Sequence, residues 1–350
     1  MISISLKHSS CNADIPIKRR ITYMRGDSGE GKTSIFSCLQ RAFEEPEIEV
    51  NVSNGYTYTT MTNDLNTALS MLRSMCKTVI VSDDQSIVER REFIKCVKDH
   101  LVQQDNYLLI INRADELHGI LKSLDYSLNS ILVAKRNGVT VNFYGEFDLE
   151  VYSGEYSDCS FSDAKCLFVE DRYGLQDLAS GLKTNNTLVL HARRGKTSFV
   201  KDLADTLEKS SVDNILLFPD LAAFGGEIGD LKALLAISTK TYMLDLEYEC
   251  FEYLLCKSNI VDVFISDDGA NKYLSWEKYY EKVLEKAEFK DFNISNGYVH
   301  SNRVPMCIRT KCSSCKRGVS GHCDKKLDGS KLAYLFNKTS FEYLIDILEG

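Results

Sequence analysis

The chain has 350 residues, of which 44% are hydrophobic and 26% are charged, a composition typical of a folded protein of one or two domains. No apolar run approaches the roughly 20 residues that a membrane-spanning helix needs, so we expect no membrane partner. The formal charge of −8 gives the chain as a whole no attraction for nucleic acid or for an anionic membrane surface.

The twelve cysteines bear on the cellular compartment. Eight of them are scattered singly along the chain, and four lie close together near the C-terminus. Scattered cysteines are typical of buried free thiols rather than of disulfides. The N-terminal residues alternate like a first strand and are too few for a signal peptide. We therefore expect a cytoplasmic protein.

The first predicted element that carries chemistry is a phosphate-binding loop. Residues 21–24 form a short apolar strand, and the spacing from Thr33 onward predicts a helix that stops before Pro46. The full pattern of a P-loop stands between them, with Gly26, Asp27, Ser28, Gly29, Glu30, Gly31, Lys32, Thr33 and Ser34 as its nucleotide-binding residues. The glycines let successive amides face phosphate oxygens, Lys32 reaches the β and γ phosphates as a catalytic cation, and Thr33 binds Mg²⁺. The sequence therefore predicts a site for ATP or GTP with Mg²⁺.

A second strand is expected to end beside this loop. The apolar run 78–82 closes with Asp83 and Asp84. We predict that Asp83 completes the Mg²⁺ site and that Asp84 polarises the attacking water, the alternative being an ordinary polar strand end. Asn112, which follows the strand 107–111, either senses the γ-phosphate or begins a loop.

Strands at 129–134 and 139–143 complete an N-terminal domain over residues 1–150. The helix expected between residues 87 and 101 shows a packing stripe on one face. Because strands and amphipathic helices alternate, we predict a parallel sheet with the nucleotide at its carboxyl edge.

A second series of strands and helices predicts another α/β domain over residues 160–262. Its first strand ends at Glu170, and its third strand runs into Asp220. The segment His191–Thr197 contains Gly-Lys-Thr between a strand and a helix but lacks the leading glycine of a P-loop. It is open whether this shortened loop holds a nucleotide, contacts another anion or only carries surface charge.

This order of elements resembles the Toprim fold of topoisomerases, primases and the overcoming-lysogenization-defect nucleases. The resemblance implies that Glu170 and Asp220 are catalytic residues that hold Mg²⁺ for phosphodiester cleavage. The sequence departs from the family pattern at Asp171, where a glycine is usual, and at Ala222, where the second aspartate of a pair is usual. These departures favour one metal ion over two.

The whole chain also resembles uncharacterised bacterial, phage and mobile-element P-loop proteins. The matching segments are residues 25–28, residues 222–225 and residues 250–254. This resemblance implies a P-loop domain joined to a Toprim-like domain, a pairing that recurs in anti-phage defence.

The remaining residues, 263–350, are expected to form a helical region that bears cysteines. Residues 275–288 show a helix with one apolar face, and Cys307, Cys312, Cys315, His322 and Cys323 follow it. Their spacing fits a structural zinc site; free or redox-active thiols and an iron–sulfur cluster are the alternatives. The segment from Arg303 to Lys338 contains nine basic and two acidic residues. This excess of positive charge indicates either a solvated surface or a patch that binds nucleic acid.

Taken together, the sequence predicts an α/β protein with a P-loop domain, a Toprim-like domain and a helical tail. We expect an Mg²⁺-dependent ATPase that acts on nucleic acid in a phage, defence or mobile-element setting. The alternative is a nucleotide-gated module that binds a partner protein through an inactive Toprim-like domain.

Overall fold

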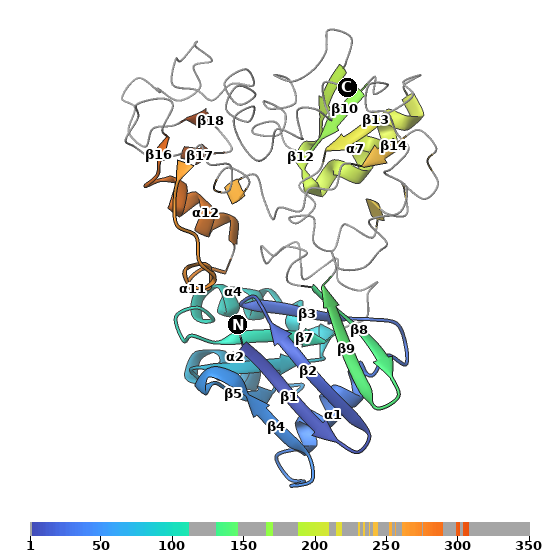
Figure 1. Ribbon diagram of the computed structural model, residues 1–350, viewed down its shortest axis with the longest axis vertical. Coiled ribbons are helices and arrows are strands. Elements are labelled where there is room, and N and C mark those ends of the chain that lie inside the picture. Colours follow the sequence, from blue (N-terminus) through green and yellow to red (C-terminus); the bar gives the residue numbers. More distant parts are fainter. Residues whose placement is uncertain are drawn as a thin grey trace. The chain divides into compact units, whose positions relative to one another are not determined.

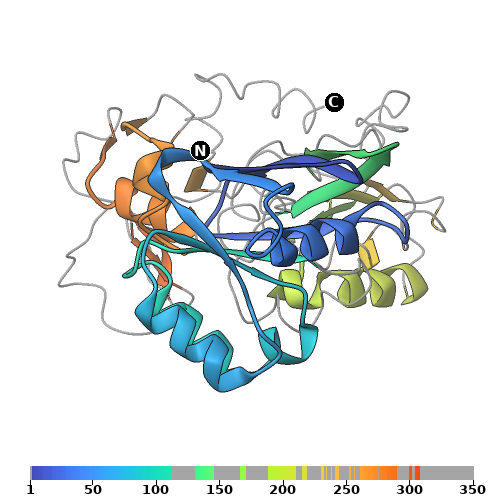
Figure 2. The ribbon, with the colours of Figure 1, turned by 90° about the horizontal axis from the view of Figure 1, so that it is seen from below.

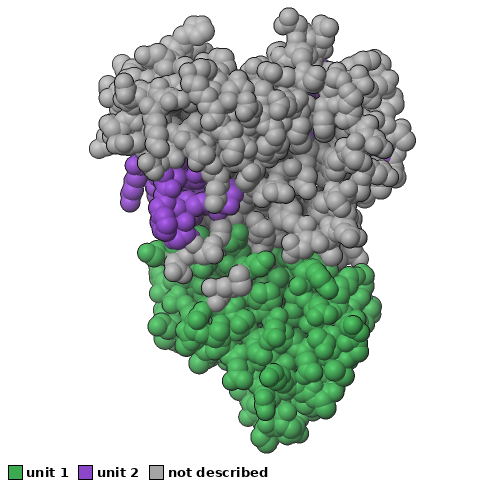
Figure 3. Space-filling view, in the orientation of Figure 1, with its two compact units in different colours: residues 1–151, 267–276 green, residues 152–266, 277–350 purple. Residues whose placement is uncertain are grey.

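The structure is a computed structural model, and its described residues are 2–111, 131–145, 166–170, 188–209, 215–218, 230–231, 234, 238, 241–243, 252–253, 256, 261–274, 276–289, 299–301 and 304–307. It is a mixed α/β fold (Figure 1). The chain divides into two compact units (Figure 3): residues 1–151 with 267–276, and residues 152–266 with 277–350. The first unit therefore includes a short segment that comes more than a hundred residues after the rest of it.

The first unit contains one nine-stranded sheet with helices. Its strands are β1 (Ile2–His8), β2 (Cys11–Ile17), β3 (Ile21–Arg25), β4 (Glu49–Val52), β5 (Thr57–Thr60), β6 (Thr78–Ser82), β7 (Tyr107–Ile111), β8 (Ile131–Asn137) and β9 (Thr140–Gly145). Its helices are α1 (Lys32–Arg41), α2 (Leu65–Ser74), α3 (Gln85–Val88), α4 (Arg91–His100), α11 (Asp267–Ala270) and the single turn η1 (Ser53–Gly55). The strand order is β4-β1-β2-β9-β8-β3-β7-β6-β5.

Five neighbouring strands of this sheet, β8, β3, β7, β6 and β5, are parallel. The predicted parallel sheet is present, but the sheet is not parallel throughout, because β1 pairs antiparallel with both β2 and β4, and β8 pairs antiparallel with β9. The physical reason is short connections: β1–β2 and β8–β9 are joined by tight turns, which permit only antiparallel pairing. The parallel part nevertheless places the carboxyl ends of β3, β6 and β7 at one edge.

The sheet curves around α1. Its two edge strands, β4 and β5, lie at opposite ends of the strand order, yet only residues 53–56 join them. A connection of that length spans at most about 17 Å, so the two edges must approach each other. The buried side chains of α1 belong to the same apolar core as buried residues of β1, β2, β6 and β7. The loop that precedes α1 is thus anchored to a helix with packing on several sides.

Both faces of the parallel strands are buried. Val79, Val81 and Leu109 belong to the core around α1. The alternate residues Ile80 and Leu108 point to the opposite face and are also fully buried, as expected for a sheet covered on both sides. Figure 2 shows α2 and α4 next to each other and apart from α1. The single helix predicted between residues 87 and 101 is instead two helices, because Arg90 has an extended conformation between α3 and α4.

The second unit contains a smaller sheet of four parallel strands. These are β10 (Cys166–Val169), β11 (Leu188–His191), β13 (Ile215–Phe218) and β14 (Thr241–Met243), in the order β11-β10-β13-β14. The strand β12 (Arg193–Gly195) leads into α7 (Lys196–Lys209). The four predicted strands of this unit are present with small shifts at their ends.

The C-terminal part contains more strands than a helical tail would. Besides α12 (Trp276–Leu284), its described residues form two antiparallel pairs, β15 (Val261–Asp262) with β16 (Glu288–Phe289) and β17 (Val299–Ser301) with β18 (Val304–Cys307). Among the helices in the described part of the chain, none has both the length and the apolar character needed to cross a bilayer.

Candidate functional site

The loop between β3 and α1 is shaped by glycines whose backbone angles other residues adopt only with strain. Gly31 is the N-cap residue of α1 and has a left-handed φ of 89°. A Cβ added to Gly26 would lie 2.8 Å from the carbonyl oxygen of Ala134, so the loop passes directly against β8. The first amides of α1 follow this turn and have no partners within the helix, which favours an anion at this position.

Replacing Gly31 with alanine should distort this loop. The new Cβ would lie 2.7 Å from Cγ2 of Val141, and the left-handed backbone adds strain. We expect the substitution to lower the free energy of unfolding by about 1–3 kcal/mol and to weaken nucleotide binding, measured by denaturation and calorimetry. In a Val141→Ala background the steric part should disappear. Gly29→Ala is the matched control, because it has a similar φ of 92° and no atom within 4 Å of its added Cβ.

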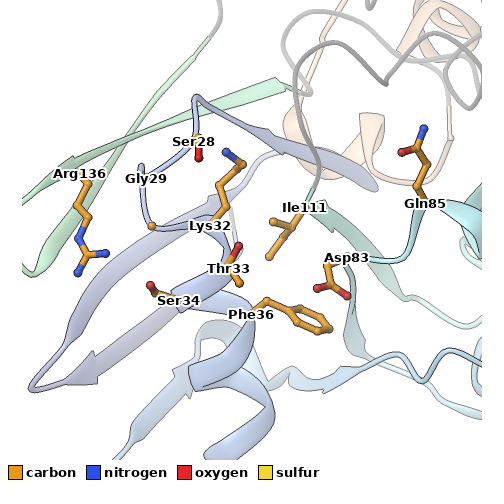
Figure 4. A pocket seen from close by; sticks show the side chains of 11 residues that line it. Ser28, Gly29, Lys32, Thr33, Ser34, Phe36, Asp83, Gln85, Ile111 and Arg136 are labelled. Atoms are coloured by element: carbon orange, nitrogen blue, oxygen red, sulfur yellow. The ribbon is translucent and has the colours of Figure 1, made fainter.

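A cavity of about 350 Å³ opens over the loop and the start of α1 (Figure 4). Its lining consists of loop and helix residues together with four residues from later elements: Ser28, Gly29, Gly31, Lys32, Thr33, Ser34, Phe36, Asp83, Gln85, Ile111 and Arg136. Six of the nine predicted P-loop residues therefore face one space. The other three, Gly26, Asp27 and Glu30, do not line the cavity.

Lys32 lies at the centre of this arrangement. Its ammonium group donates to the carbonyl oxygens of Gly26 and of Asp27, the latter at 2.8 Å. The side chain is thus folded over the loop, with its charge beside the N-terminus of α1. A phosphate at this position would meet the lysine charge and the amides of the helix N-terminus together.

Thr33 and Asp83 face the cavity from two different strand–helix connections (Figure 4). In the sheet, β7 lies between β3 and β6, so the ends of β3 and β6 are about 10 Å apart at the usual strand spacing. That distance leaves room for a metal ion with its oxygen ligands. A hydroxyl and a carboxylate are ligand types that Mg²⁺ accepts, so these two residues suit it.

Asp83 is exposed at the mouth of the cavity, yet its pKa is raised above the usual aspartate value. Partial burial by the surrounding chain is the main cause, and the neighbouring charge of Asp84 adds to it. A carboxylate whose charge is unfavourable in the free protein gains most from a bound cation.

Asp84 has a different position. Its Oδ1 accepts hydrogen bonds from the amide and the hydroxyl of Ser86, at 2.8 and 2.7 Å, and this caps the N-terminus of α3. Asp84 does not line the cavity. The sequence placed both aspartates at the site, whereas the structure directs one of them to the cavity and the other to a helix cap.

Asparagine at position 83 should therefore impair binding of the Mg²⁺ complex far more than asparagine at position 84. We expect Asp83→Asn to weaken ATP binding about tenfold or more when Mg²⁺ is present and to leave binding in EDTA nearly unchanged. Since the pKa of Asp83 is raised, the Mg²⁺ benefit in the wild type should decline on acidification at a higher pH than for an ordinary aspartate. Equal losses in Asp83→Asn and Asp84→Asn would contradict this assignment.

The three loop residues outside the cavity connect the loop to the β8–β9 hairpin. Oε2 of Glu30 accepts a hydrogen bond of 2.5 Å from the backbone amide of Arg136. The ammonium group of Lys135 lies 3.6 Å from Oδ2 of Asp27 and 3.9 Å from Oε1 of Glu30. Glu30 thus ties the loop to β8 through its hydrogen bond, whereas the longer and more exposed Lys135 contacts contribute little. Neither acidic side chain is expected to touch phosphate.

Sequence reasoning missed Gln85 and Arg136 as cavity residues. Gln85 is the first residue of α3, directly after the two aspartates, so its position in the motif was the available signal. No local pattern indicates Arg136, because it reaches the loop only through the pairing of β8 with β3. Asn112 lies outside the described residues, although Ile111 before it lines the cavity.

In the second unit, Glu170 follows β10 at the carboxyl edge of the parallel sheet. Its side chain is only 9% exposed. A Cβ added to Gly195 would lie 3.7 Å from Oε1 of Glu170, so the turn before α7 passes beside this carboxylate. Val169 is in register with Phe218 on β13, so the carboxyl ends of β10 and β13 lie at the same edge. Asp220 itself lies outside the described residues.

An ion pair joins the shortened Gly-Lys-Thr segment to α7. Arg193 donates from its backbone amide and its guanidinium to Asp202 of α7, and Nη2 also lies 3.3 Å from Oδ2 of Asp205. Burial alone would raise the pKa of Asp202, but hydrogen bonds from Arg193 and Ser198 lower it to about 2. This pair therefore stabilises the unit above about pH 4 and is lost as the pH falls toward 2. The charge of Arg193 is therefore paired with acidic residues of α7.

The predicted cysteine cluster is described only at its beginning. The backbone of Cys307 ends β18, whereas Cys312, Cys315, His322 and Cys323 lie outside the described residues. Within the residues that are described, no group of three or more histidine, cysteine or acidic side chains is placed to hold a metal ion. The zinc site stays a prediction.

Comparison with known proteins adds no further assignment. The sequence matches no protein-family model and no curated protein, so any function must be argued from the geometry of the cavity itself.

Proposed function

We propose that this chain binds Mg²⁺ and a nucleoside triphosphate at the cavity over α1 and hydrolyses the nucleotide. The observation that carries the proposal is the convergence of Lys32, Thr33 and Asp83 on one space. These residues come from two connections that are 50 positions apart in sequence, yet they supply the cation, the hydroxyl and the carboxylate that a metal–triphosphate requires.

Each residue has a distinct contribution in this proposal. The loop amides and Lys32 bind phosphate oxygens and hold the nucleotide over the helix N-terminus. Thr33 and Asp83 would hold Mg²⁺, which neutralises phosphate charge when bound. Gln85 lies on the Asp83 side of the cavity (Figure 4). Its side-chain amide, whose Nε2 donates to Oε1 of Glu89 at 2.8 Å, is of a type suited to orienting water.

One observation favours a second function, a slow nucleotide-gated switch. Asp83 is the only carboxylate that lines the cavity among the described residues, and Asp84 is engaged as the cap of α3. Without a second carboxylate to polarise water, hydrolysis would be slow and the nucleotide would mainly stabilise one conformation. Binding would then serve recognition of a partner protein.

The direct test is to measure Mg²⁺-dependent binding and turnover on the same preparation. Calorimetry should detect ATP or GTP binding that strengthens with Mg²⁺, and phosphate release should be measured at saturating nucleotide. Turnover of about 1 s⁻¹ or more, the range of ordinary enzymes, supports the hydrolase. Tight binding with turnover far below that supports the switch. If neither nucleotide binds, both forms of the proposal are wrong.

For the second unit we propose a Toprim-like metal site that acts on nucleic acid, which the nearly buried position of Glu170 at a parallel-sheet edge supports. We expect the wild type to nick plasmid DNA or cleave RNA with Mg²⁺ or Mn²⁺, and Glu170→Gln to abolish this while nucleotide binding is kept. Glu208→Gln, the same substitution at an exposed position of α7, is the matched control. If Glu170→Gln cuts as well as the wild type, this site is not a nuclease centre.

A further inference from the structure

Arg136 is the one cavity residue that comes from the β8–β9 hairpin. The strand β8 is parallel to β3 and pairs with it through Arg25 and Val133. It then continues four residues further, alongside the P-loop, and turns into β9. Arg136 therefore stands beside the loop, with its Cδ 3.7 Å from where a Cβ of Gly31 would lie.

The Arg136 side chain is exposed to solvent but held in place. Its Nε donates to the carbonyl oxygen of Gly138 at 2.8 Å, and Nη2 donates to that of Ser10 at 3.2 Å. Its backbone amide donates to Glu30 of the loop. Nη1 has no hydrogen-bond partner among the described residues. The guanidinium is thus oriented before any ligand arrives, which reduces the entropy lost on binding.

The sheet order places Arg136 and Asp83 on opposite sides of the loop. β8 neighbours β3 on one side, whereas β7 and then β6, which leads to Asp83, lie on the other. Figure 4 shows the same arrangement: Gly29 and Lys32 lie between Arg136 on one side and Asp83 on the other. Thr33 and Asp83 would hold Mg²⁺, and the charge that the metal would supply is needed at the β and γ phosphates. The γ-phosphate therefore belongs on the Asp83 side, and the α-phosphate and nucleoside belong on the Arg136 side.

We propose that Arg136 binds the α-phosphate of the nucleotide, so that the hairpin supplies a second cation to the site in addition to Lys32. The inference rests on the proposed function and makes it more specific. It assigns the cavity to nucleoside 5′-phosphates bound in one direction, with the nucleoside leaving the loop over the hairpin.

The test compares Arg136→Gln with the wild type in calorimetric titrations of ATP, ADP and GTP. An α-phosphate contact is common to all three ligands, so the dissociation constant should rise about tenfold or more and by the same factor for each. Lys135→Gln removes the same charge from the neighbouring residue, which does not line the cavity, and should cost less than about threefold. Arg136→Lys keeps the charge and should recover part of the affinity.

Several results would overturn this assignment. A much larger loss for ATP than for ADP would place Arg136 at the γ-phosphate, and different losses for ATP and GTP would place it at the base. Equal losses in Arg136→Gln and Lys135→Gln would show a general charge effect. Melting of the ligand-free variants checks the fold, and Arg136→Lys replaces Arg136→Gln if the latter unfolds. If the wild type binds no nucleotide, the proposed function itself has failed.

Discussion

Replacing Lys32 with alanine should abolish detectable nucleotide binding while the protein stays folded. The ammonium group lies over the loop carbonyls of Gly26 and Asp27, at the N-terminus of α1, where the phosphates are expected. Loss of a charge-assisted contact to phosphate should weaken binding by about 100-fold, or about 3 kcal/mol. Calorimetry with ATP and Mg²⁺ measures this directly.

The matched control is Lys18→Ala, since Lys18 is an exposed lysine between β2 and β3, outside the cavity. This variant should bind like the wild type. Lys32→Ala should change the free energy of unfolding by no more than about 1 kcal/mol, because its two hydrogen bonds are to partly exposed carbonyl groups. Unchanged affinity in Lys32→Ala would show that phosphate does not bind at this loop.

Replacing Arg20 with alanine should have the opposite profile, a large loss of stability from a residue far from the loop. Arg20 precedes β3, at the end of the strand opposite to the P-loop, and its side chain is only 7% exposed. Its Nε donates to the carbonyl oxygen of Asn271 at 2.6 Å, Nη1 to that of Asn106 at 3.1 Å, and Nη2 to Oδ1 of Asp105 at 2.7 Å. Its guanidinium carbon also lies 4.3 Å from the centre of the Tyr107 ring.

The substitution would leave the buried carbonyl group of Asn106 and the partly buried carbonyl group of Asn271 without their donor. Asp105 would lose its ion pair, but it is partly exposed to solvent and keeps a hydrogen bond of 2.8 Å from the hydroxyl of Tyr56. The cost of losing Arg20 is therefore smaller at Asp105. The carbonyl group of Asn106 is buried, so its loss of a donor is not offset by solvent in this way. We expect Arg20→Ala to lower the free energy of unfolding of the first unit by about 2–4 kcal/mol, measured by chemical denaturation.

Arg41 provides a matched control for Arg20. Arg41, the last residue of α1, also makes a bidentate ion pair, with Glu45 four residues later, but this pair is exposed to solvent. Exposed pairs of this kind contribute little, so Arg41→Ala should leave the unfolding midpoint unchanged. Similar effects of the two substitutions would refute the view that burial of Arg20 makes the difference. Arg20→Ala should also release the segment 267–276, which hydrogen exchange at Asn271 and its neighbours would detect.

Local signals were sufficient for the elements that carry the candidate site. The glycine pattern, the apolar strand before it and the helical spacing after it predicted β3, the loop and α1. The strands β6 and β7 are buried on both faces, and their continuous apolar sequences indicated such strands directly. The same signals singled out Lys32, Thr33 and Asp83, which line one cavity in the structure, because all three follow a strand end closely.

Other features depend on which strands pair, and sequence spacing carries little information about that. The antiparallel pairs, the continuation of β8 along the loop and the place of Arg136 in the cavity follow from strand order. Asp84 caps α3 whereas Asp83 faces the cavity, because the chain turns into the helix directly after the two aspartates. Two adjacent aspartates in a sequence do not show which one takes which position.

The sequence by itself determined the strand, the glycine loop and the helix of the candidate site, because these elements are consecutive and need only local contacts. The nucleotide ligand stays a prediction. Only the tertiary structure decided what surrounds the loop. The curvature of the sheet around α1, the hairpin beside Gly26 and Gly31, and the inclusion of residues 267–276 in the first unit all join segments distant in sequence. Their pairing is set by the shared burial of apolar faces over the whole unit, a quantity that no short segment contains.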